Sequence, residues 1–146
     1  MARPFHFKLD KVLDYREQLE EQARGALARA QVARDAQADR LADLERRLAA
    51  HLAAQAESRT SANDMWLWRQ YRDALSQDVS IARVELNGLE LKLQRCRAEA
   101  VERSKDRKLL EKLKQTQAKR HHDQENAREE KENDEMATLR YEPHDH

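Results

Sequence analysis

Apolar residues recur along most of this chain with the spacing of a helix that packs against a partner. Between residues 75 and 110, an inward-facing position returns every three or four residues without a break. An average spacing of 3.5 residues keeps one face of an α-helix turned toward its neighbour along the whole length. The positions in this series are Leu75, Val79, Ala82, Leu86, Leu89, Leu93, Cys96, Ala100, Arg103, Arg107 and Leu110.

A weaker series with the same spacing precedes it and predicts a first helix. It contains two consecutive steps of four residues near Leu41, an insertion that locally unwinds a supercoil. The alanines between residues 23 and 33 predict a close approach of the two helices. The positions in this series are Val12, Arg16, Leu19, Ala23, Ala26, Ala30, Ala33, Gln37, Leu41, Leu44, Leu48 and Leu52.

Residues 57–64 are rich in Ser, Thr, Asn and Asp and separate the two series. Ser61, followed three residues later by Asp64, resembles a capping box that would start a second helix. Two long helices joined by a short connection are antiparallel neighbours. We therefore predict an all-α fold, a long antiparallel two-helix coiled-coil hairpin, that forms one domain over residues 1–146. The expected bounds are about 8–57 for helix 1, about 58–64 for the turn and about 65–141 for helix 2.

A turn near Ser61 also predicts the register, because the numbers of paired residues should add up to about 122. Phe5 would then lie opposite about Gln117, and residues 117–140 would extend beyond helix 1. This overhang has almost no apolar seam, and such a helix is marginal by itself. Two interpretations stand: a solvated, frayed helix, or a segment that becomes ordered inside a partner.

Two arginines, Arg103 and Arg107, occupy seam positions where apolar residues would be usual. We expect them either to pair with acidic residues of helix 1 or to extend outward to solvent. The acidic residues within reach include Asp10, Asp14 and Glu20.

The composition suits long helices and gives little sign of catalysis. Of the residues, 38% are charged and 5% are aromatic, with two Gly and two Pro in 146 positions. No Gly-rich phosphate loop, His-Glu-x-x-His or Cys-x-x-Cys motif is present. His121 and His122 are adjacent, so on a helix they point about 100° apart and do not bind one metal ion together. We predict a protein that is not an enzyme and has no metal or cofactor.

Charge is balanced over the chain but not locally. Residues 101–120 are basic and residues 123–135 acidic, although 28 basic residues match 28 acidic ones overall. The basic stretch lacks interleaved aromatic residues, so a solvated face or a docking surface for an acidic protein is favoured over nucleic-acid binding. No apolar run approaches the ~20 residues that span a bilayer. With no evident signal peptide and one cysteine, we expect a cytoplasmic protein that does not insert into the membrane.

Three aromatic residues, Trp66, Trp68 and Tyr71, follow the predicted turn. Trp66 and Trp68 are 200° apart around a helix, so both cannot face the seam and at least one should be exposed. Exposed Trp and Tyr side chains are favoured anchors in protein interfaces. The cluster therefore either closes the end of the hairpin or forms part of an interface.

Four segments together resemble the flagellar export protein FliJ family. The opening Phe-His-Phe-Lys-Leu-Asp-Lys-Val-Leu-Asp-Tyr-Arg at 5–16 is similar to that family's aromatic pair, then Leu, then Val-Leu-x-x-Arg. The middle matches as Trp66-x-Trp-x-x-Tyr-x-x-x-Leu75. Two further landmarks are Arg-Lys-Leu-Leu-Glu-Lys-Leu at 107–113 and Glu-Glu-Lys-Glu-Asn-Asp-Glu-Met-Ala at 129–137. The segments span nearly the whole chain in the family's order.

The resemblance implies a soluble, non-enzymatic component of the flagellar type III export apparatus, built like the central stalk of a rotary ATPase. Such a protein would bind and promote the hexameric export ATPase, couple it to the cytoplasmic domain of the export gate, and bind export chaperones. It would associate peripherally with the apparatus at the inner membrane. The alternatives are the equivalent stalk of a virulence type III secretion system and a generic coiled-coil scaffold.

Matched position by position, the resemblance also implies binding residues. The acidic face before Asp134 and the two adjacent histidines match no landmark of the family and receive no role. Gate contacts fall on Trp68, Tyr71 and Leu75, whereas ATPase contacts fall on Phe7, Leu9, Leu13, Arg16, Leu113, Asp134, Glu135, Met136 and Arg140.

Overall fold

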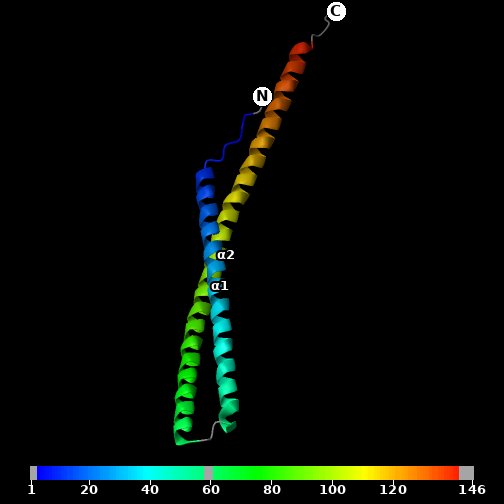
Figure 1. Cartoon of the computed structure of the whole chain (residues 1–146). Helices are drawn as coiled ribbons and strands as arrows, with labels where there is room; N and C mark the ends of the chain where they lie inside the picture. Colours follow the sequence, from blue (N-terminus) through cyan, green and yellow to red (C-terminus); the bar gives the residue numbers. More distant parts are fainter. Residues whose placement is uncertain (1–2, 58–60, 142–146) are drawn as a thin grey trace, which may run out of the picture. The chain divides into compact units, whose positions relative to one another are not determined.

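Two long helices dominate the computed structural model, which describes residues 3–57 and 61–141 (Figure 1). Helix α1 spans Asp10–Ala53 and is followed by the short 3-10 helix η1 at Ala54–Glu57, and α2 spans Ala62–Arg140. The described residues contain no strand. Because the two helices pack against each other, the prediction of an all-α helical hairpin is confirmed.

Helix α2 begins at Ala62, which is three residues earlier than the sequence predicted. The reason is the cap: the Ser61 hydroxyl accepts a hydrogen bond of 3.1 Å from the backbone N–H of Asp64. This bond satisfies one of the amide groups that a helix leaves unpaired in its first turn. Residues 58–60 of the predicted turn lie outside the described residues.

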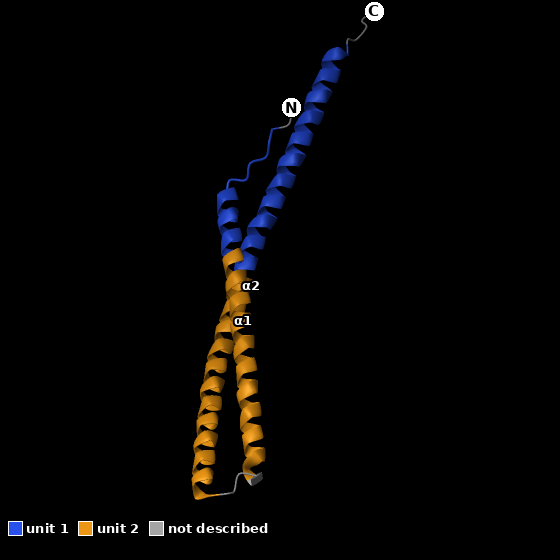
Figure 2. Cartoon of the chain, in the orientation of Figure 1, with its two compact units in different colours: residues 1–20, 102–146 blue, residues 21–101 orange. Residues whose placement is uncertain are grey.

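The chain divides into two compact units, each containing a part of α1 and a part of α2 (Figure 2). Unit 2, residues 21–101, contains the main apolar cluster. In this cluster Leu41 and Leu44 of α1 pack with α2, and Leu48 and Leu86 pack against its edge. The contributions of α2 to the cluster are Leu75, Val79 and Ala82. The single-domain organisation stays a prediction.

The predicted register holds in unit 2. The Gln37 side-chain amide donates to the Glu85 carboxylate at 3.2 Å and to the backbone carbonyl of Ala82 at 3.1 Å. The numbers of Gln37 and Glu85 add up to 122, as a turn near Ser61 requires. Turn chemistry and hydrophobic spacing therefore identified the correct pairing of the helices.

Unit 1 comprises residues 1–20 and 102–146, and its register agrees as well. The Arg16 guanidinium donates to the backbone carbonyl of Asp106 at 2.9 Å, and these numbers again add up to 122. Phe7 and Leu13 are buried with Leu110 of α2, and Phe5 packs against this small cluster.

The position of the N-terminal arm, residues 3–9, corrects the sequence analysis. Phe5 does not lie opposite Gln117, because its ring lies 5.7 Å from that of His121, one turn further along α2. The backbone N–H of Arg3 donates to Glu125 at 3.5 Å. An extended chain covers about 3.3 Å per residue, whereas a helix rises only 1.5 Å. The non-helical arm therefore reaches further than a helix would, and the part of α2 without a partner begins after Glu125 rather than at Gln117.

Candidate functional site

The aromatic cluster at the start of α2 is organised around Trp68. Its side chain is only 6% exposed, and its ring stacks on that of His51 with the centroids 4.6 Å apart. The indole N–H donates to the backbone carbonyl of His51 at 3.2 Å. His51 Nε2 in turn lies 2.9 Å from the carbonyl oxygen of Trp68. Because that oxygen can only accept, Nε2 carries the proton, and α1 and α2 are joined by two reciprocal hydrogen bonds.

Tyr71 and Trp66 present the exposed aromatic surface of this cluster. Tyr71 contacts His51 edge-on with 4.8 Å between ring centroids, yet about half of its surface is open to solvent. Trp66 is 57% exposed, which confirms the expectation that one tryptophan faces outward. Of the residues expected to contact the gate, Trp68 and Leu75 are buried, and Tyr71 is accessible.

His51 is a residue of this cluster that sequence reasoning did not identify. The register alone could have found it, because a partner sum of 122 places His51 opposite Tyr71. A single histidine beside the apolar series forms no recognisable sequence pattern. Its role becomes visible only when the residues of the two helices are paired one by one.

The first five residues expected to contact the ATPase differ in their exposure to solvent. Phe7 and Leu13 are buried in unit 1, and Arg16 is half-buried through its bond to α2. Leu9 and Leu113 are partly exposed. Phe7, Leu13 and Arg16 therefore hold the arm and the start of α1 against α2. Leu9 and Leu113, in contrast, are available to another protein.

An ion pair also joins the first residue of α1 to α2 in unit 1. Lys114 Nζ lies 2.9 Å from Asp10 Oδ1. This hydrogen bond is the main reason why the pKa of Lys114 lies above its ordinary value. Both side chains are substantially exposed, so the pair contributes little to stability.

A more buried pair joins Arg107 to Glu20, which confirms one of the two expectations for the seam arginines. Glu20 is a buried charged residue, and it accepts from the Arg107 Nε–H. Arg107 also lies 2.6 Å from Glu111. Hydrogen bonds to Glu20 first and to Glu111 second raise the pKa of Arg107, so its guanidinium stays charged throughout the accessible pH range.

Replacing Arg107 with leucine is expected to lower the free energy of unfolding by about 3 kcal/mol, because Glu20 then remains buried without this guanidinium. Urea unfolding followed by circular dichroism measures the change. The matched control is Arg83→Leu, which breaks the exposed 3.0 Å pair with Glu45 and should cost about 1 kcal/mol or less. Equal losses in both variants would contradict a special role for the buried pair.

The C-terminal end of α2 differs from the rest of the helix because every residue from 126 to 140 is exposed. Arg128 forms ion pairs with Glu125 and with Glu132, and both partners lie on α2 as well. No described contact links this end to residues 5–16 in the arm and the start of α1. The nine expected ATPase contacts therefore fall into two groups, of which Asp134, Glu135, Met136 and Arg140 form the fully exposed one.

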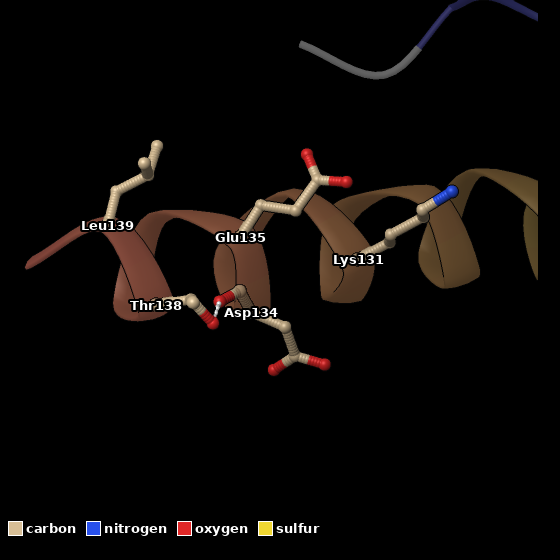
Figure 3. Close-up of a pocket in the computed structure, with 5 residues that line it drawn as sticks. All are labelled: Lys131, Asp134, Glu135, Thr138 and Leu139. Atoms are coloured by element: carbon tan, nitrogen blue, oxygen red, sulfur yellow. Dashed lines mark hydrogen bonds between the residues drawn. The ribbon is translucent and has the colours of Figure 1, made fainter. Parts of the chain in front are cut away.

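A shallow groove runs along this end of α2, and all of its lining residues lie on the one helix (Figure 3). The Thr138 hydroxyl donates to the backbone carbonyl of Asp134 at 2.8 Å, so its side chain is turned back onto the helix. Such a surface can be bound by a protein that surrounds the helix but does not enclose a small molecule. The lining residues are Lys131, Asp134, Glu135, Thr138 and Leu139.

Metal and membrane chemistry are not evident in the part of the chain that the structure describes. No group of three or more His, Cys, Asp and Glu side chains there is arranged to bind a metal ion. His121 Nε2 lies 2.7 Å from the backbone carbonyl of Arg3, and His122 contacts Asn126. None of the described helices combines the length and the apolar character needed to cross a bilayer.

The sequence was compared with family models, with curated proteins and with solved structures. The family model described as "Flagellar FliJ protein" matches residues 5–144 of the 146 residues. No curated protein and no solved structure matches the chain significantly.

Proposed function

This chain belongs to the flagellar FliJ protein family, and from that premise we propose that it is a stalk that binds the hexameric flagellar export ATPase. Membership confirms the resemblance drawn from the four sequence segments and makes the chain a component of flagellar protein export. In the proposed role it promotes the activity of the ATPase and couples it to the export gate. It contributes no catalytic group and needs no cofactor.

The exposed end of α2 is the observation that supports this role most strongly. Where no tertiary packing is present, only helix propagation stabilises the end of a helix, so this end is marginally stable in water. Residues 126–140 are nevertheless rich in helix-forming residues and carry only a few apolar side chains, among them Met136 and Leu139. A protein that surrounds this segment would stabilise it, and the weakly apolar surface would permit repositioning without aggregation.

We assign direct ATPase contacts to the exposed residues of the predicted set. These are Leu9, Leu113, Asp134, Glu135, Met136 and Arg140. Phe7, Leu13 and Arg16 act indirectly in this proposal, because they hold the N-terminal arm and the start of α1 against α2.

The gate contact is assigned to Tyr71, with Trp68 and Leu75 holding the helices beneath it. Export chaperones are further proposed partners, and nucleic acid is not. The proposed location is the cytoplasm, in peripheral association with the export apparatus at the inner membrane. The family match is to the flagellar protein, which favours this assignment over the stalk of a virulence secretion system or a generic scaffold.

The proposal is tested by measuring ATP hydrolysis by the export ATPase of the same organism, with and without the purified full-length chain. We expect the chain to raise the rate and to co-sediment with the ATPase ring. No stimulation and no co-sedimentation at any protein concentration would contradict the stalk role.

A further inference from the structure

A second apolar stripe follows the outer face of α2 in unit 2, the orange unit of Figure 2. Ile81, Val84 and Leu91 are 50%, 71% and 60% exposed, and the exposed Gly88 lies among them. Their spacing of three, four and three residues places them on one side of the helix. We call these four residues the Gly88 stripe.

The Gly88 stripe faces away from the seam that packs on α1. Val79 is buried in the core cluster, and Ile81, two residues later, points about 200° away from it. Exposed alanines, Ala74 and Ala98, continue the stripe at its two ends. Helix α2 therefore has two apolar faces, and the described part of this chain covers only one of them.

No contact in the described part of the chain requires a glycine at position 88. A Cβ atom at this position would meet nothing within 4 Å, so the fold does not exclude a side chain there. Glycine lowers helix stability relative to alanine, and here the chain gains no close internal contact in return. In the middle of an exposed apolar stripe, the missing side chain leaves room for a large residue of another helix.

We propose that the Gly88 stripe binds the same stripe of a second copy of this chain, with the two α2 helices antiparallel. A twofold axis near Leu86 places Val84 of each copy against Gly88 of the other. The same axis places Ile81 against Leu91 and Ala74 against Ala98. Each bulky residue then meets a glycine or an apolar partner, as alternating large and small residues require in a packed seam.

Charge complementarity favours a second copy in this orientation. The same axis brings Asp78 near Lys92 of the other copy, and the twofold symmetry gives two such attractions in the dimer. Glu85 approaches its own equivalent, but its carboxylate accepts a hydrogen bond from Gln37 within its own chain. A parallel arrangement would instead place Arg95 against Arg95, whereas the antiparallel one places Arg95 against Gln77.

The contact is small, since three large apolar side chains from each copy supply most of it. Interfaces of this size are typical of weak, reversible association rather than of permanent dimers. We expect monomers at low concentration and a fraction of dimers that rises as the concentration increases, as is typical of small interfaces.

Sedimentation equilibrium of the full-length chain over a wide concentration range tests the association. Val84→Glu should weaken it at least tenfold. The matched control is Val32→Glu, because Val32 on α1 is 69% exposed and lies outside the stripe. Circular dichroism verifies that both variants keep the helix content of the wild type. A wild type that stays monomeric at every concentration, or equal effects of the two substitutions, would overturn the proposal.

The antiparallel geometry is tested by pairs of nitroxide labels in a Cys96→Ser background. Single cysteines for labelling replace Arg69 in one variant and Ser76 in another, both exposed and seven residues apart on α2. In an antiparallel dimer the label separation should differ by about 20 Å between these variants, because each residue further from the axis adds 1.5 Å on each copy. Equal separations would indicate a parallel dimer and overturn the proposed arrangement.

Discussion

Replacing Trp68 with alanine is expected to lower the free energy of unfolding by about 3–5 kcal/mol, the usual cost of truncating a buried aromatic residue. The change removes the ring that stacks on His51 and one of the two reciprocal hydrogen bonds between α1 and α2. Urea unfolding followed by circular dichroism measures the loss. Trp66→Ala is the matched control, because Trp66 is more than half exposed and its loss should cost about 0.5 kcal/mol or less.

Tyr71→Ala separates gate binding from stability. Tyr71 keeps about half of its surface exposed, so its removal should affect unfolding much less than the loss of Trp68. It should nevertheless weaken binding to the cytoplasmic domain of the gate about tenfold, equivalent to roughly 1.4 kcal/mol. Isothermal titration calorimetry gives this affinity. Unchanged gate binding in a folded Tyr71→Ala variant would contradict the assignment of Tyr71 as the contact.

Replacing Met136 with glutamate is expected to raise the concentration of chain that is needed to stimulate the export ATPase. Met136 is an apolar residue on the exposed end of α2, beside the acidic Asp134 and Glu135. A further negative charge would have to be desolvated at the contact, so the apparent affinity should fall at least tenfold, or about 1.4 kcal/mol. The measurement is the concentration of chain that gives half-maximal stimulation.

The control for this variant is Val32→Glu, which also introduces a glutamate in place of an exposed apolar residue. Val32 lies on α1, far from Met136 in the sequence. It should leave the stimulation unchanged. Both variants should unfold like the wild type, because neither position is buried. A Met136→Glu variant that stimulates the ATPase normally would remove this end of α2 from the binding surface.

Hydrophobic spacing and turn chemistry together predicted the hairpin and its register. The bond from Arg16 to the Asp106 carbonyl and the bond from Gln37 to Glu85 both lie on the predicted pairing. The pairing of Arg107 with Glu20 was among the expected alternatives for the same reason. Long helices leave few choices once the turn is located, so a short pattern of seam residues determines many distant contacts.

The N-terminal arm and the aromatic cluster could be predicted only in part. The arm is not helical, and a register calculated for helices cannot give the distance that it covers along α2. The stacking of Trp68 on His51 depends on side-chain rotamers and on which of two tryptophans turns inward. Periodicity showed that one must be exposed but did not say which, and the structure identifies Trp66.

The binding residues were assigned through the family resemblance, and the structure sorts them by accessibility. Leu75 and Trp68 are buried, so a family match at these positions reports on packing as well as on binding. Asp134 and Arg140, in contrast, lie on the exposed end of α2, residues 126–140, for which no tertiary contact is described. No pattern within the chain reveals the surface of a partner, which is why these contacts need direct measurement.

Hydrogen exchange of the full-length chain, alone and bound to the hexameric export ATPase, tests the stalk role most directly. In the isolated chain the amides of residues 126–140 should exchange quickly, because no tertiary packing stabilises this part of α2. Binding should slow their exchange by more than about tenfold, whereas amides of the buried seam around Val79 should change little. Exchange at 126–140 that is the same with and without the ATPase would contradict the account.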